Sequence, residues 1–145
     1  MADLTLTSRA HETVAQDRWL RVTAVIFAVA VLVHGADHVR RGIDVATAVV
    51  RDAGAIQFVL GAIAVVLVFR GNRWAPAAAV FVGFLSAAGF AAAHLLPHWS
   101  AFSDPYTGSV VAPHVNAFSW VTALFEIAAD TAFGVAGLRA MRTAA

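Results

Sequence analysis

The chain has 145 residues, of which 60% are hydrophobic and 13% charged, with a formal net charge of +1 and no cysteine. Soluble domains average ~45–50% apolar and ~25% charged residues, so this composition indicates a membrane protein with room for one domain. The small net charge argues against nucleic-acid binding, which needs a basic patch. The absence of cysteine excludes disulfides, iron–sulfur clusters and thiolate metal sites.

Four apolar segments follow one another along the chain. A helix crosses the hydrocarbon core of a bilayer in about 20 apolar residues. We expect such helices at about residues 19–39, 53–69, 77–96 and 113–138, with the third ended by Pro97. The sequence therefore predicts an all-α integral membrane protein, a single domain over residues 1–145 that forms an antiparallel bundle of four transmembrane helices.

Arginine is distributed unequally between the two ends of this bundle. Short loops on the cytoplasmic side of a membrane carry an excess of basic residues. One end carries seven arginines and the other three, which are Arg9, Arg18, Arg21, Arg70, Arg73, Arg139 and Arg142 against Arg40, Arg41 and Arg51. We therefore expect a multi-pass protein of the cell membrane with both termini in the cytoplasm.

Five histidines fall at the outward end of the expected helices. Histidine is rare in lipid and usually marks function there, and imidazole is the commonest protein ligand of transition metals. His34 and His38 share one helical face because they are four residues apart, and His94 and His98 repeat that spacing. His114 opens the fourth segment, and Asp37 shares part of the face of His34. These six residues are the candidate metal ligands, for zinc or copper first.

The histidines have other interpretations. They are compatible with interfacial side chains that bond lipid headgroups or loop carbonyls, or with a proton-transfer or pH-sensing cluster. A b-type haem held between His34 and His94, or between His38 and His114, is a further alternative. The spacing does not decide among these interpretations.

A second polar feature lies on the fourth segment. Ser119, Thr122, Glu126 and Asp130 form a stripe at helical spacing, and Glu126 falls near the middle of the membrane. A bare carboxylate is costly at that depth, so a neutral, protonated Glu126 is the simplest interpretation. The stripe fits a hydrogen-bonded core in which Glu126 meets Gln57 or Ser86, a path for protons or cations, or a contact with another subunit.

These observations predict a membrane protein with an outward-facing polyhistidine metal site. Such a protein could be a metal-dependent enzyme or a transporter of metal or protons. The rival hypothesis is a non-catalytic subunit of a larger respiratory or transport complex. Besides the lipid bilayer, the expected partners are a second copy of the chain or such a complex.

Overall fold

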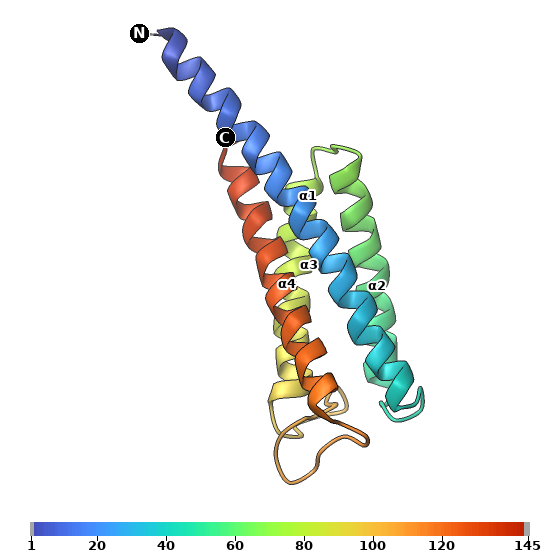
Figure 1. Cartoon of the computed structure of the whole chain (residues 1–145). Helices are drawn as coiled ribbons and strands as arrows, with labels where there is room; N and C mark the ends of the chain where they lie inside the picture. Colours follow the sequence, from blue (N-terminus) through green and yellow to red (C-terminus); the bar gives the residue numbers. More distant parts are fainter. Residues whose placement is uncertain (1, 144–145) are drawn as a thin grey trace.

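The computed structural model describes the backbone of residues 2–143 and the side chains of residues 18–142. Four α-helices follow in order, α1 (Ala2–Arg41), α2 (Ala48–Phe69), α3 (Ala75–Phe90) and α4 (Ala117–Thr143), and a π-helical turn, η1 (Ala91–Leu95), continues α3. The described residues contain no strand. Successive helices run in opposite directions, so the segments that link α1 to α2 and α3 to α4 lie at the same end (Figure 1).

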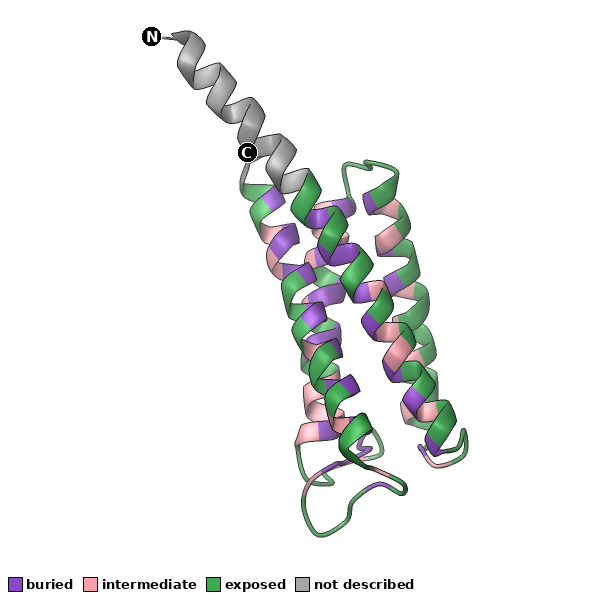
Figure 2. Cartoon of the chain, in the orientation of Figure 1, coloured by how far each residue is buried: buried purple, intermediate pink, exposed green. Residues whose placement is uncertain are grey.

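The expectation of four long apolar helices is confirmed. Residues 18–41, 48–69, 75–95 and 117–142 are each long and apolar enough to cross a membrane. Large apolar side chains such as Trp19, Phe58 and Phe81 are at least half exposed on the outside of the bundle, and the inward faces hold most of the buried positions (Figure 2). An apolar exterior of this kind suits a bundle whose surroundings are hydrocarbon.

The fourth helix begins at Ala117, four residues later than the expectation based on Pro113. His114 has a φ of 60°, a left-handed conformation that interrupts a right-handed helix. Asn116 then caps the new helix, because its Oδ1 accepts from the backbone N–H groups of Phe118 at 2.9 Å and Ser119 at 3.3 Å. The second helix begins earlier than residue 53, at Ala48, where the Thr47 hydroxyl accepts from the Val50 N–H.

The core lies between α1, α3 and α4, whereas α2 is peripheral. In the most apolar stretch of α4, half of the residues are buried, whereas in that of α2 only 17% are buried. Phe27 of α1 and Phe133 of α4 pack together with ring centroids 4.9 Å apart, and small residues fill much of the remaining core. Because α2 packs loosely against the other helices, space remains beside the histidines.

The long segment 96–116 folds back over the end of α3. Its backbone N–H groups at Asp104 and Tyr106 donate to the carbonyls of Ala93 at 3.1 Å and His94 at 2.8 Å, which lie in η1. The Thr107 hydroxyl donates to the Leu95 carbonyl at 3.1 Å. These bonds satisfy carbonyl groups that a helix end leaves without partners, and they fix the loop next to His94.

Candidate metal centre

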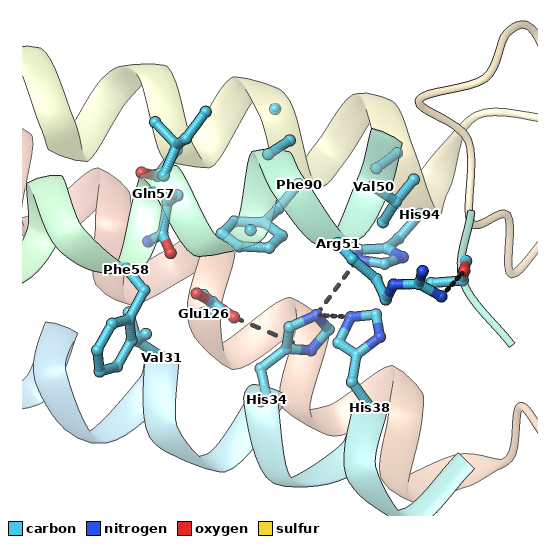
Figure 3. Close-up of a pocket in the computed structure, with 18 of the residues that line it drawn as sticks. Val31, His34, His38, Val50, Arg51, Gln57, Phe58, Phe90, His94 and Glu126 are labelled. Atoms are coloured by element: carbon cyan, nitrogen blue, oxygen red, sulfur yellow. Dashed lines mark hydrogen bonds and ion pairs between the residues drawn. The ribbon is translucent and has the colours of Figure 1, made fainter. Parts of the chain in front are cut away.

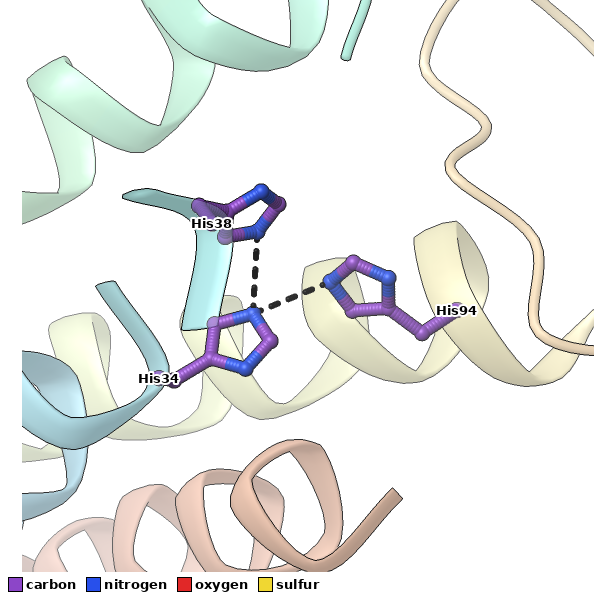
Figure 4. Close-up of side chains that lie close together, drawn as sticks. All are labelled: His34, His38 and His94. Carbon is purple, nitrogen blue, oxygen red and sulfur yellow. Dashed lines mark hydrogen bonds between the residues drawn. The ribbon is translucent and has the colours of Figure 1, made fainter. Parts of the chain in front are cut away.

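Three histidines from two helices meet near one end of the bundle. This is the end with the segments that connect α1 to α2 and α3 to α4, and we call it the link end. His34 and His38 come from α1 and His94 from η1, and one ligand atom of each lies within 4.8 Å of those of the other two. The Nε2 atom of His34 is 3.2 Å from the Nε2 of His94 and 3.2 Å from the Nε2 of His38. Figure 4 shows the three rings turned toward one another.

The spacing of these nitrogens suits a metal ion. Two nitrogens bound at ~2.0–2.1 Å to a tetrahedral ion lie about 3.3–3.4 Å apart, close to the two observed separations of 3.2 Å. His34 and His94 are nearly completely buried, and His38 is partly buried. The cluster therefore has the donor type, the separation and the enclosure of a three-histidine metal site.

The π-helical turn positions His94. A π-turn adds about one residue to a helical turn, and such turns are frequent at functional sites. Here it covers residues 91–95 and carries His94 on its inner side, buried against the ring of Tyr106 at 4.5 Å. Because Leu96 is extended and Pro97 cannot donate a backbone hydrogen bond, the helix ends directly after the ligand position.

Hydrogen bonds assign the tautomers of two of the three rings. His94 Nδ1 is 2.9 Å from the Asp104 carbonyl, which can only accept, so Nδ1 carries the proton and Nε2 has a lone pair. The Thr122 hydroxyl donates to the Ser119 carbonyl and therefore accepts from His34 Nδ1 at 3.4 Å. The Nε2 of His34 is then also unprotonated.

His38 has a different partner. Its Nδ1 accepts from Arg41 Nη2 at 3.0 Å, because a guanidinium group can only donate. The proton of neutral His38 therefore lies on Nε2 and points toward His34 at 3.2 Å. To coordinate through Nε2, neutral His38 must carry its proton on Nδ1 instead, which requires Arg41 Nη2 to move away. His34 and His94 already have an unprotonated Nε2.

Three ion pairs next to the triad involve the nearby carboxylates. Asp37 accepts from Arg40 Nε at 2.9 Å and lies 3.3 Å from Arg41 Nε. Asp104 forms a short ion pair with Arg41 Nη2 and also accepts from Arg41 Nη1 at 3.2 Å. The structure thus places Asp37, a predicted ligand, in a buried ion-pair network next to the triad, where it holds the arginine that contacts His38.

The structure does not bring the other two histidines into the cluster. The side chains of His98 and His114 are exposed, and neither contributes to the group of converging ligand atoms in the described part of the chain. His98 follows Pro97, beyond the end of η1. His114 instead provides a backbone carbonyl, which accepts from Arg40 Nη2 at 3.1 Å.

The predicted polar stripe lies on the inner side of α4. Ser119, Thr122, Glu126 and Asp130 are all at most 1% exposed. Glu126 Oε2 lies 3.9 Å from His34 Nδ1 (Figure 3). Both carboxyl groups and the Gln57 amide nitrogen have no hydrogen-bond partner among the described residues, so the expected bond between Glu126 and Gln57 is not formed.

Tyr106 is a site residue that sequence reasoning missed. Its ring packs against His94 and Trp120 and lies under the Arg41 guanidinium at 5.3 Å. Burial raises the pKa of the Tyr106 phenol above its ordinary value, so the side chain stays neutral at physiological pH. No sequence motif predicts that Tyr106 contacts His94, because this contact depends on the path of the segment 96–116.

No family model matches the chain, and no curated protein or solved structure shows significant similarity to it. Its function is therefore inferred from its own residues.

Proposed function

We propose that this chain is a membrane protein that binds one transition-metal ion, zinc or copper, through the Nε2 atoms of His34, His38 and His94. The observation that carries this proposal is the contact between His34 Nε2 and His94 Nε2 at 3.2 Å. Both nitrogens are unprotonated when the tautomers follow their partners, so two lone pairs face each other in a buried place. A cation between them converts this repulsion into coordination.

The donor set indicates which ions fit. Imidazole suits zinc, copper and other first-row transition metals, whereas magnesium and calcium prefer oxygen ligands. Three nitrogens leave a fourth position for another ligand, as in catalytic rather than structural zinc sites. A metal-dependent enzyme and a metal carrier both need such an open position.

Haem is not favoured by this geometry. An iron ligated on both faces separates its two axial nitrogens by about 4 Å, with the macrocycle between them. His34 and His94 are closer than this, and His38 contacts the same His34 nitrogen at 3.2 Å. The proposed partner of His38, His114, is exposed.

Metal analysis of single-histidine variants tests the proposal. The purified chain should hold about one equivalent of zinc or copper, and His38→Ala and His94→Ala should each remove most of it, because two imidazoles bind a borderline ion far more weakly than three. His98→Ala and His114→Ala are matched controls at the same end of the bundle and should retain the metal. Equal loss in all four variants, or no metal in the unchanged protein after incubation with zinc or copper, contradicts the proposed site.

The metal ion should also dissociate at low pH. Protonated imidazole cannot ligate, so affinity should fall as the pH is lowered from about 7 through the range in which the histidines of the metal-free chain become protonated. Protons compete with the metal, so acid weakens binding and alkali does not. Isothermal titration at several pH values measures this dependence. An affinity that stays constant over the range would mean that the ion binds through groups other than imidazole.

A transport role is the second candidate, because the buried Glu126 and Asp130 carboxyl groups continue from the triad along α4 and have no hydrogen-bond partner among the described residues. Such groups fit a path for protons or cations better than a hydrogen-bonded core.

The subunit hypothesis has no comparable observation in its favour. Purification of the chain alone, as a stable and metal-loaded species, would argue against it.

A further inference from the structure

A cavity of about 660 Å³ adjoins the histidine triad, bounded mainly by α1, α2 and α3. Its volume is within the ~300–1,000 Å³ range of small-molecule sites. His34, His38 and His94 line it at the link end, and most of the remaining wall is apolar (Figure 3). A ligand here would have one end at the metal centre and the rest against hydrocarbon side chains.

The cavity is elongated along α2. Its lining on that helix extends from Val50 to Leu60, a length of about 15 Å at the helical rise of ~1.5 Å per residue. Ile56, Phe58 and Leu85 belong to the lining and are 62%, 51% and 56% exposed. The border of the cavity therefore faces the apolar surroundings of the bundle, from which a lipophilic molecule can reach it.

Arg51 adds a cationic group to the same cavity. Its contacts with Asp44 at 3.5 Å and with the carbonyls of Ile43 and Ala46 all use Nη1, so Nε and Nη2 can donate to a ligand. Arg41, by contrast, is occupied by Asp37, Asp104 and His38. Figure 3 shows Arg51 near His94, and Glu126 beside His34 on the side away from Arg51.

We infer that this cavity binds a long-chain carboxylate, with its carboxylate group between the metal's open position and Arg51 and its hydrocarbon chain along α2. The inference rests on the proposed metal centre. Carboxylate oxygens ligate zinc and copper, and they are strong acceptors for guanidinium N–H groups. A dication on neutral imidazoles together with Arg51 makes this end positive, which favours an anionic head over a neutral or cationic one.

Cobalt provides the probe, since Co²⁺ bound in place of zinc gives visible bands that respond to a change in its ligands. The full-length chain, purified in detergent and loaded with Co²⁺, is titrated with dodecanoate, acetate and dodecan-1-ol. Dodecanoate should shift the bands at a concentration at least about tenfold lower than acetate. Dodecan-1-ol, which has the chain but no carboxylate, should leave them unchanged.

Two variants separate binding in the cavity from partition into the micelle. A Cβ on Gly54 meets nothing within 4 Å, and Gly54 lines the cavity, so the side chain of Gly54→Leu starts in open space and takes up part of the cavity, and leucine favours the helix. Ala62→Leu is the matched control, because Ala62 is an exposed residue of the same helix. Gly54→Leu should weaken the dodecanoate response about tenfold, and Ala62→Leu should not. The Co²⁺ bands without added carboxylate should be the same in both.

Arg51→Gln tests the head group separately. It should weaken the response to dodecanoate and leave Co²⁺ binding intact, because Arg51 is not a metal ligand. If Co²⁺ gives no bands of histidine coordination, the metal centre and the carboxylate site both fail. If the bands form but dodecanoate acts no better than acetate, or acts equally on Gly54→Leu, the carboxylate site alone is overturned and the metal centre stands.

Discussion

At the scale of single residues, the triad depends on what each histidine does with its second nitrogen. The Asp104 carbonyl fixes His94 and the Thr122 hydroxyl orients His34. Such partners hold the tautomer and the ring orientation of metal-binding histidines. His38 instead accepts from Arg41, so it is the ligand that must rearrange most when a metal binds.

Glu126 permits a sharp prediction at this scale. Its carboxyl oxygens are buried and have no hydrogen-bond partner among the described residues, so Glu126→Gln should leave the melting temperature nearly unchanged, and Glu126→Leu should raise it, because a buried polar group without a hydrogen bond is removed. Thermal unfolding in detergent measures both. A transport path through α4 additionally requires that the Gln variant lose flux in vesicles while it keeps its metal. Unfolding of the Gln variant would instead reveal a structural partner for the carboxylate.

The sequence predicted part of the histidine cluster, for reasons visible in these residues. His34 and His38 could be paired because an i, i+4 spacing on a helix determines a shared face, and the alternating topology placed His94 at their level. The exclusion of His98 and His114 could not be predicted. It depends on where η1 ends and on the backbone of the segment 96–116, which follows long-range contacts such as the ion pair between Asp104 and Arg41.

At the scale of helices, length and hydropathy predicted the four segments because these are averages over some 20 residues. The local departures were not predictable in the same way. The π-turn over residues 91–95 has no sequence signature here, and His114 takes a positive φ that glycine or asparagine would have announced. Both departures lie at the histidine end, where the chain leaves regular geometry to build the site.

The packing of α3 on α4 gives a prediction for this scale. A Cβ on Gly83 would lie 2.6 Å from the Asp130 carbonyl oxygen and 2.6 Å from the Gly134 nitrogen, so Gly83→Ala should force the two backbones apart at a cost of about 1–3 kcal/mol. Gly89→Ala on the same helix is the control, since its Cβ meets nothing within 4 Å. Thermal unfolding should show a clear loss for the first variant and none for the second. Equal melting temperatures of the two variants would contradict the close contact between α3 and α4 at Gly83.

At the scale of the whole molecule, the arginines of the two ends differ in their surroundings as well as in number. Arg40 and Arg41 at the histidine end are paired with Asp37 and Asp104, which reduces the positive charge of that end. Arg18, Arg21, Arg70 and Arg73 lie at the opposite end of the described helices. The positive-inside rule counts basic residues rather than net charge, so the asymmetry it uses is the seven arginines at one end against three at the other.

We therefore predict that the histidine end faces away from the cytoplasm. The chain has no cysteine, so single cysteines can report each side. Ser109→Cys is suitable for the segment 96–116 because Ser109 is exposed, whereas Ser103 is buried and accepts two backbone hydrogen bonds. Asn72→Cys reports the exposed turn between α2 and α3. In intact cells, a membrane-impermeant thiol reagent should label Ser109→Cys and spare Asn72→Cys, and both should react after lysis. The reverse pattern would place the metal centre on the cytoplasmic side, where the metal and the carboxylate would have to come from inside the cell.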